Sequence, residues 1–255
     1  MLFKEASLKG SDCVGKTFAS NKCGDFVVIE YKDYDNVVVK FTATGSIVTT
    51  QLYHVKDGSI KDRMFPSICG VGIVGEKYPL ENGKQSKEYN VWVRMLDRCY
   101  STANNTRKTY EGCEVTSSFR YFPFFKEWCH NQVGFGEKGF ALDKDILVKG
   151  NKVYSPETCC FVPQEINNLL TNKKMGSKSI RSGVSFNKEC GKYIVRFSKG
   201  SKTKHIGYFV TELEAFLAYK EAKEQQIKVV ANRWKDQIDQ RVYEALMNWE
   251  VDITD

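Results

Sequence analysis

The sequence predicts an α+β protein, because patterns typical of strands and of helices occupy separate stretches of the chain instead of alternating regularly. Three observations lead to this fold class. Runs of β-branched residues fill residues 26–52, and a helical stripe of apolar residues covers 89–100. Three short alternating strands then precede an Ala-rich helical pattern that begins near residue 211. With 255 residues the chain is long enough to bury a core in each region.

Residues 1–78 are expected to form a first domain, a small β-barrel or meander of SH3-like character. Phe26–Tyr31 and Asn36–Phe41 are β-branched runs joined by Lys-Asp-Tyr-Asp, a spacer typical of a hairpin. A third strand is expected over Ile47–Leu52. The glycine-rich run Gly70–Gly75 does not predict a dinucleotide site, because no helical pattern follows it.

Residues 79–172 are expected to form a second domain. The apolar and alternating patterns predict two helices, two strands and a third helix, over 89–100, 122–129, 140–147, 153–162 and 164–170. Pro163 can open the last helix, since proline is favoured in a first helical turn. The second half of this domain therefore has the order strand, turn, strand, helix.

Residues 173–255 are expected to form a third domain, in which three strands are covered by a helix. Thr211 and Glu214 have the spacing of a capping box at the start of that helix. Pleating sorts the strand residues onto two faces. The apolar face is predicted to carry Val184, Phe186, Tyr193, Val195, Phe197, Ile206 and Tyr208. The opposite, polar face is predicted to carry Ser185, Asn187, Lys192, Ile194, Arg196, Ser198, Thr203 and His205.

Positive charge is concentrated on this third domain. Between Gly176 and Lys204 there are eight lysines or arginines and one acid, Glu189, an excess of seven that equals the net charge of the whole chain, +7. Charge gathered on one small sheet indicates a polyanion as partner, and double-stranded DNA is the first candidate. The polar face has the width and the side chains to read base edges in a major groove.

The same stretch resembles the AP2 DNA-binding domain. The resemblance lies in Ser-Gly-Val-Ser-Phe (182–186), Gly-Lys-Tyr-Ile-Val-Arg-Phe (191–197), His-Ile-Gly-Tyr-Phe (205–209), Thr-Glu-Leu-Glu-Ala (211–215) and Ala-Tyr (218–219). It implies a three-stranded sheet that enters the major groove with a helix behind it. By this resemblance the contact positions are Ser182, Ser185, Asn187, Arg196, Ser198 and His205. Arg181 and Lys192, from the same basic stretch, complete the predicted DNA-binding set.

The strand–turn–strand–helix at 140–170 resembles the HNH, or ββα-metal, nuclease motif. The resemblance places Asp143 and Asn167 at the two metal-ligand positions, and Thr158 where an orienting asparagine is usual. Lys144 falls at the position of the catalytic histidine. The metal of such a site stabilises the charge that develops on the scissile phosphate while a base activates water. The predicted catalytic residues are therefore Asp143, Lys144 and Asn167, with Mg²⁺ or Mn²⁺ as cofactor.

Lys144 leaves two alternatives open, because a lysine with its ordinary pKa of about 10.4 is protonated at neutral pH. In the first, burial lowers the pKa of Lys144, or His130, Tyr154 or Asp145 activates the water, and the protein cuts DNA. In the second, the motif is a degenerate nuclease in which Lys144 grips a phosphate.

The wider pattern resembles bacteriophage homing endonucleases that join an HNH-type module to a C-terminal AP2 domain. The resemblance runs over about residues 89–225 and includes Trp92, the pair Cys99-Tyr100 and Tyr-Ser-Pro-Glu-Thr-Cys (154–159). It implies metal-dependent hydrolysis of double-stranded DNA by a phage-encoded protein in the cytoplasm of a bacterial host. The alternative is a catalytically inactive DNA-binding or regulatory phage protein. Oligomeric state stays open.

The nine cysteines include no Cys-x-x-Cys pair, which argues against a structural zinc site and favours free thiols in a reducing compartment. A zinc site assembled from Cys99, Cys113, Cys129 and His130 is the alternative. The longest apolar runs are strand-sized and the N-terminal residues lack an apolar signal core, so neither a membrane span nor secretion is expected.

Overall fold

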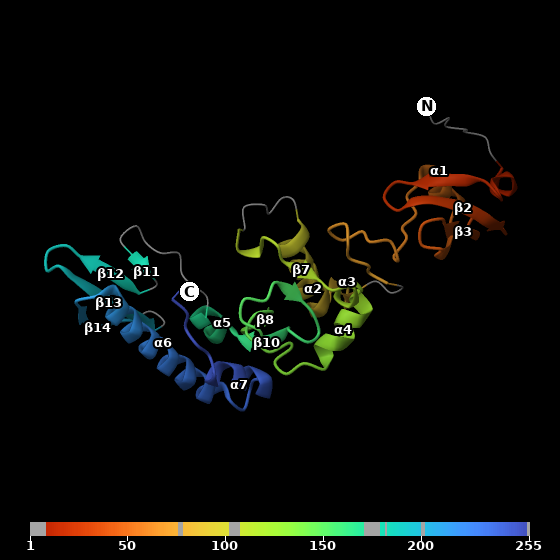
Figure 1. Cartoon of the computed structure of the whole chain (residues 1–255). Coiled ribbons are helices and arrows are strands. Elements are labelled where there is room, and N and C mark those ends of the chain that lie inside the picture. The colour runs from red at the N-terminus through yellow and green to blue at the C-terminus, as the bar shows by residue number, and fades with distance from the viewer. Residues whose placement is uncertain are drawn as a thin grey trace. The chain divides into compact units, whose positions relative to one another are not determined.

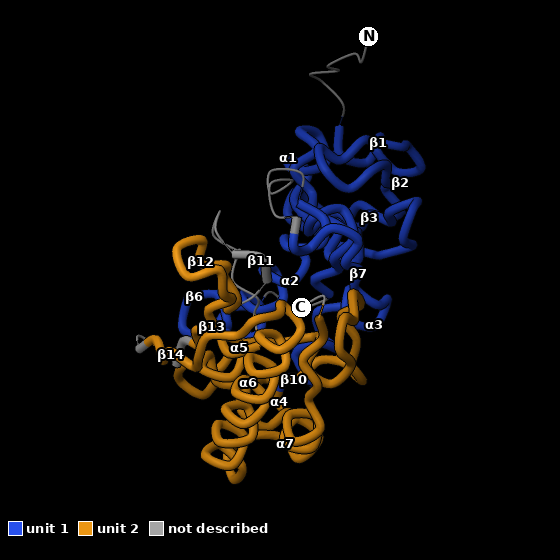
Figure 2. Tube along the Cα trace, turned by 60° about the vertical axis from the view of Figure 1, so that its left-hand side comes forward, with its two compact units in different colours: residues 1–129 blue, residues 130–255 orange. Residues whose placement is uncertain are grey.

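The computed structural model describes residues 9–75, 79–101, 108–170, 179–181, 183–199 and 202–253. The chain divides into two compact units, Met1–Cys129 and His130–Asp255, which Figure 2 shows in different colours. Both units combine helices with small sheets, so the predicted α+β class is confirmed. Of the helices that the structure describes, none is both long and apolar enough to cross a membrane.

The first unit begins with a four-stranded antiparallel meander in the order β1-β2-β3-β4. Its elements are η1 (Gly10–Cys13), β1 (Thr17–Ser20), β2 (Gly24–Tyr31), β3 (Val37–Phe41), β4 (Ile47–Thr50) and α1 (Leu52–Asp57). Phe26 and Val28 of β2 and Val39 and Phe41 of β3 are fully buried at alternate positions and form its core. In the sheet as described, β1 and β4 are both edges, so it is an open meander and not a closed barrel.

Helix α1 differs from the expected strand end, because Leu52 begins a helix instead of closing a third strand. Leu52 and Val55 lie on one side of α1 and join the core of the meander. Gly58 ends α1 in the left-handed conformation, with φ of 71°. The helix thus adds two apolar side chains to the core of the meander.

The rest of the first unit is helical and aromatic. Its elements are β5 (Leu80–Glu81), β6 (Lys84–Gln85), α2 (Lys87–Tyr100), η3 (Lys108–Tyr110), β7 (Glu114–Val115), α3 (Ser117–Arg120) and α4 (Phe122–His130). Ser86 caps α2 by accepting a hydrogen bond from the backbone N–H of Tyr89. Trp92 is fully buried and donates from its indole Nε1 to the carbonyl oxygen of Phe119 at 2.7 Å. Both long helices that the sequence predicts here are present.

The second unit opens with a strand–loop–strand–helix arrangement, called the ββα finger below. It consists of β8 (Phe140–Asp143), the loop from 144 to 159 with β9 (Val153–Tyr154), β10 (Cys160–Pro163) and α5 (Gln164–Leu170). β8 and β10 are antiparallel, with Asp143 opposite Cys160 and Phe140 opposite Pro163. The second strand expected over 153–162 is interrupted, as Pro156 suggested, and α5 has the predicted bounds.

The basic sheet of the second unit has four strands in the order β11-β12-β13-β14, one more than the three expected. Their bounds are β11 (Ser179–Arg181), β12 (Val184–Asn187), β13 (Lys192–Lys199) and β14 (Lys202–Phe209). Two helices follow, α6 (Glu212–Trp234) and α7 (Gln240–Met247). The predicted capping box is present, since Thr211 Oγ1 accepts from Glu214 N and the Glu214 carboxylate accepts from Thr211 N.

Two apolar cores hold the second unit together, and α6 contributes to both. The sheet core packs Val184, Val195 and Phe197 against Ala215, Phe216 and Tyr219 of α6, with Val251 added from the C-terminal segment. The finger core packs Ile146, Cys160, Val162 and Ile166 against Ile227, Val230 and Ala231 of α6 and against Ile238, Val242 and Leu246. Figure 1 shows α6 running from the strands of the basic sheet to α7.

Candidate functional site

The outer face of the basic sheet, the face turned away from α6, follows from the strand register. Ser185, Ile194 and Tyr208 stand opposite one another on three neighbouring strands. Directly opposed residues share a face, and side chains two positions along a strand return to it. Asn187 pairs with Lys192, and Arg196 pairs with His205. We call the surface formed by Ser185, Asn187, Lys192, Ile194, Arg196, Thr203, His205 and Tyr208 the basic face.

A β-bulge places Tyr208 on the basic face, in contrast to the strict alternation assumed from the sequence. Val195 pairs with Gly207 and Arg196 with His205, so Ile206 is the extra residue of β14. Ile206 packs against the sheet core, as expected, whereas the next side chains change face. Tyr208 is 55% exposed, and its ring centroid lies 4.9 Å from that of His205. The bulge thereby adds an aromatic ring to a polar surface.

The charged groups of the basic face are not neutralised within the described part of the chain. Lys192 and Arg196 are both exposed, and neither forms an ion pair with any residue that the structure describes. Ile194, which lies between them along β13, is only 7% exposed. Two cations therefore flank a covered apolar side chain on one strand.

Asn187 stabilises a turn in addition to lying on the basic face. Its side-chain Oδ1 accepts a hydrogen bond from the backbone N–H of Glu189 at 2.9 Å, which holds the turn from β12 to β13. Gly191 completes that turn with φ of 65°. Because Oδ1 is engaged, the amide Nδ2 is the group of Asn187 suited to an external acceptor.

Three of the predicted DNA contacts are Ser182, Arg181 and Ser198. Ser182 lies outside the described residues. Arg181 lies in β11 and Ser198 in β13, where Ser198 is opposite Thr203, and only their backbone is described. By register, Ser198 occupies a position of the basic face.

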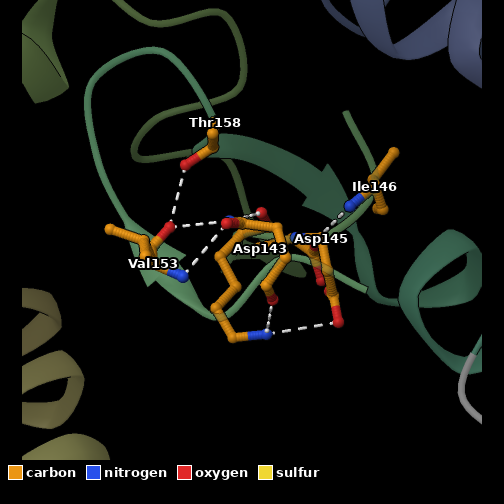
Figure 3. Close-up of polar contacts among 7 residues, drawn as sticks. Asp143, Asp145, Ile146, Val153 and Thr158 are labelled. Carbon is orange, nitrogen blue, oxygen red and sulfur yellow. Dashed lines mark hydrogen bonds and ion pairs between the residues drawn. The ribbon is translucent and has the colours of Figure 1, made fainter. Parts of the chain in front are cut away.

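Asp143 is the last residue of β8 and turns the chain into the finger loop. Its Oδ1 accepts hydrogen bonds from the backbone N–H groups of Asp145 and Ile146, each at 2.9 Å (Figure 3). These bonds end the strand four residues before the sequence pattern suggested. Burial, and after it the charge of Asp145, raises the pKa of Asp143 to about 6. The carboxyl is thus held in surroundings that disfavour its charged form.

Lys144 is 7% exposed, and its ammonium group is bonded inside the finger loop. Nζ donates to the carbonyl oxygen of Asn151 at 2.9 Å and to Oδ2 of Asp145 at 3.2 Å. It also lies 5.9 Å from the centre of the Tyr154 ring. In this arrangement the lysine is a hydrogen-bond donor that closes the loop.

Asn151 is a residue of the finger that the sequence did not single out. Its Nδ2 donates to the carbonyl oxygens of Lys144 and Val153, both at 2.7 Å, and its Oδ1 accepts from Val153 N at 3.1 Å. Thr158, expected at the position of an orienting asparagine, donates to the same carbonyl of Val153 at 2.9 Å. Both side chains therefore fix the loop that follows Asp143. The sequence did contain a signal for this role, the tripeptide Lys-Gly-Asn at 149–151, which is typical of a turn and ends in an asparagine whose side chain can bond to the backbone.

The oxygen donors of the ββα finger suit a hard cation better than zinc. Asn167 is half-buried on α5, which packs against β8 and β10, and it offers an amide oxygen. Asp143 and Asp145 offer carboxylates, and oxygen donors with bound water are what Mg²⁺ prefers. Burial raises the pKa of the neighbouring Cys159 thiol to about 12, so it stays protonated. Within the described ranges, no three His, Cys, Asp or Glu side chains are grouped so that they could hold a metal ion.

All nine cysteines are free thiols. Six are buried, Cys69 and Cys99 are half-buried, and Cys190 is exposed at the β12–β13 turn. Of the residues considered for a zinc site, Cys113 and Cys129 are buried and His130 is exposed with its ring against Phe135.

Comparisons with protein-family models, with curated proteins and with solved structures gave no match to this chain.

Proposed function

We propose that this protein binds double-stranded DNA through the basic face of its four-stranded sheet. The observation that carries the proposal is the pair of exposed cations, Lys192 and Arg196, on a sheet whose other face is covered by α6. Phosphates attract such cations, and arginine can also bond two acceptors of a guanine edge. Ser185, His205 and the amide of Asn187 supply further donors on the same surface.

The resemblance to the AP2 domain supports this proposal and supplies the remaining contacts. It brings Ser182 and Ser198 into the proposed interface beside the described residues, and Arg181 of the same basic stretch joins them. Tyr208, which the resemblance did not place among the contact positions, stands next to His205 and offers a flat ring to sugar or base. A β-sheet is a known way of entering a groove.

The first test is Arg196→Ala. Loss of a base-reading arginine is expected to weaken binding to a selected DNA site by about 1–3 kcal/mol, or roughly 5- to 150-fold in Kd. Fluorescence anisotropy of labelled DNA measures this at two salt concentrations. Lys228→Ala, which removes an exposed cation from α6, is the control and should leave Kd within about twofold. An affinity that does not change with salt contradicts binding by this surface.

The second part of the proposal assigns metal-dependent phosphodiester hydrolysis to the ββα finger. Asp143 and Asn167 would hold one Mg²⁺ or Mn²⁺, which supplies charge stabilisation at the scissile phosphate. The residues of the finger hold the metal-binding carboxylate and the loop behind it in place. Two backbone N–H groups orient the Asp143 carboxylate, and the bonds of Asn151 and Thr158 hold the loop behind it. Lys144 acts on that loop, so water activation falls to another group, of which Asp145 is the nearest along the chain.

The alternative function is DNA binding without cleavage, as in a regulatory protein with a degenerate finger. The contacts of Lys144 favour it, because a donor engaged with Asp145 and Asn151 is neither a base nor a free phosphate ligand. In that case the finger would serve as scaffold for the basic sheet.

Plasmid nicking with Mg²⁺ or Mn²⁺ separates the two functions. If the finger cleaves DNA, Asp143→Ala is expected to lower the nicking rate at least about 100-fold, whereas Lys144→Met is expected to cost less. Nicking that survives Asp143→Ala removes the proposed metal site. Tight, salt-dependent binding without any nicking by the wild type supports the non-catalytic alternative.

A further inference from the structure

The ββα finger and the basic sheet share helix α6. Its first half contributes Ala215, Phe216 and Tyr219 to the sheet core, and its second half contributes Ile227 and Val230 to the finger core. The helix runs unbroken over 23 residues. A continuous helix that packs into one core with its first half and into another with its second half is a stiff connection, since bending it would open one core or the other.

The far end of α6 is fixed to the finger helix by polar bonds. Glu165 of α5 accepts from Nη1 of Arg233 at 2.6 Å and from the indole Nε1 of Trp234 at 2.9 Å. The ring of Trp234 meets that of Phe140 edge-on, with centroids 6.0 Å apart. Both carboxylate oxygens of Glu165 are therefore bonded to the last turn of α6, two residues away from Asn167.

The C-terminal strap, residues 248–253, makes a second connection in the opposite direction. Val251 is 2% exposed in the sheet core; its N–H donates to Oε1 of Glu224 at 2.8 Å and its carbonyl accepts from Nζ of Lys220 at 2.9 Å. Lys149 of the finger loop donates from Nζ to the carbonyl of Glu250 at 2.9 Å. The strap thus joins the finger loop, α6 and the sheet core.

The chain leaves the sheet along α6, builds the finger core with α7, and returns to the sheet through the strap. We propose that this double connection makes the finger and the basic face one rigid body. The finger then meets the DNA backbone at a fixed number of base pairs from the sequence that the basic face reads. The proposal deepens the proposed function and rests on both of its parts, DNA binding by the basic face and a finger that meets the DNA; it does not require that the finger cleaves.

The length of α6 sets the scale of the spacing. Roughly twelve residues separate the middle of the sheet core from the middle of the finger core along α6, about 18 Å of helix. B-DNA rises about 3.4 Å per base pair, so a separation of this length along the DNA axis would correspond to about five base pairs, less than one turn of about ten.

Hydroxyl-radical footprinting on a selected DNA site, without added metal, tests the proposal. The wild type is expected to protect two patches of backbone at one spacing, and both should shift together when the read sequence is moved along the fragment. Lys152→Glu, a charge reversal on the exposed part of the finger loop, identifies the patch made by the finger because protection there should fall. A single patch with normal affinity overturns the proposal and leaves DNA binding intact.

An uncoupled variant sharpens the test. Gly-Ser-Gly-Ser inserted after Glu221, between the two cores, is expected to leave the patch of the basic face sharp and to spread or remove the finger patch. The same four residues inserted after the exposed Lys235, beyond α6, are the control and should preserve the spacing. Unchanged spacing and sharpness in the uncoupled variant contradict rigid coupling.

Absence of any footprint in the wild type overturns the proposed function itself. Should the insertion not fold, the wild-type pattern and Lys152→Glu still decide the question.

Discussion

Replacing Gly183 with alanine is expected to lower the free energy of unfolding of the second unit by about 3 kcal/mol. Gly183 has φ of 71°, a left-handed conformation that costs alanine about 1 kcal/mol. A Cβ at this position would also lie 2.3 Å from the Tyr219 ring and 2.7 Å from the carbonyl oxygen of Arg196. Neither neighbour can move easily, because Tyr219 is buried between α6 and the sheet and the carbonyl belongs to β13.

Gly191→Ala provides the matched control. Gly191 also has positive φ, 65°, but a Cβ there would have nothing within 4 Å, so the expected cost is only about 1 kcal/mol. Urea unfolding, together with hydrogen exchange of peptides from β12 to β14, measures both variants. Since Gly183 accepts the backbone hydrogen bond of Arg196, DNA affinity should fall with Gly183→Ala as well. Equal losses in the two variants would show that packing against Tyr219 contributes nothing.

Asp143→Asn is expected to raise the stability of the second unit at pH 7 by up to about 3 kcal/mol. The pKa of Asp143 in the folded protein is about 6, above the value near 3.9 of an unfolded chain, chiefly because the carboxyl is buried. The folded state therefore holds the proton more tightly. The stability that this provides is complete below about pH 4, is lost as the pH rises to about 6, and stays lost above. Asparagine keeps an oxygen for the N–H groups of Asp145 and Ile146 and carries no charge to bury.

Urea unfolding between pH 4 and pH 7 measures the effect, which should be a falling slope in the wild type and a flatter one in Asp143→Asn. Asp239→Asn is a control of opposite sign, because the hydrogen bond from Arg241 lowers the pKa of Asp239 and its charge stabilises the fold above about pH 4. Added Mg²⁺ should stabilise wild type more than Asp143→Asn if the carboxylate binds it. Equal pH slopes in wild type and Asp143→Asn would show that Asp143 is not held in its neutral form.

The elements that the sequence predicted well are those whose cause is local. Helix α5 follows from Pro163 and a short apolar stripe, and the start of α6 follows from Thr211 and Glu214, whose bonds form within one turn. The paired strands of the meander follow from β-branched runs and a turn-forming spacer. Such patterns can be recognised in a sequence because the residues that contact one another are separated by only a few positions along the chain.

The features that the sequence missed depend on distant partners. Ile206 looks like any alternating strand residue, and only its pairing against Val195 and Arg196 makes it a bulge that turns Tyr208 outward. The stripe of α6 after Tyr219 gives no sign that Ile227 and Val230 meet the finger instead of the sheet. These contacts arise from tertiary packing, which local periodicity does not encode.

In the ββα finger, too, some features could be predicted from the sequence and others could not. Asp143 could be named from strand order and residue type, whereas the burial that raises its pKa is a property of the folded core. Lys144 could be named only by position. Its bonds to Asn151 and Asp145 depend on how a loop of sixteen residues closes, which no spacing in the sequence specifies.

The strap has a consequence for how the second unit folds while the chain is being synthesised. The ribosome synthesises the basic strands before Val251. The sheet core is therefore incomplete until Val251 has been added to the chain, because its side chain is part of that core. The finger core in turn waits for Val242 and Leu246. The nascent chain therefore carries exposed apolar strand residues from the synthesis of β12 until that of Val251, and both halves of the second unit should reach their final packing together, only after Val251 has been made.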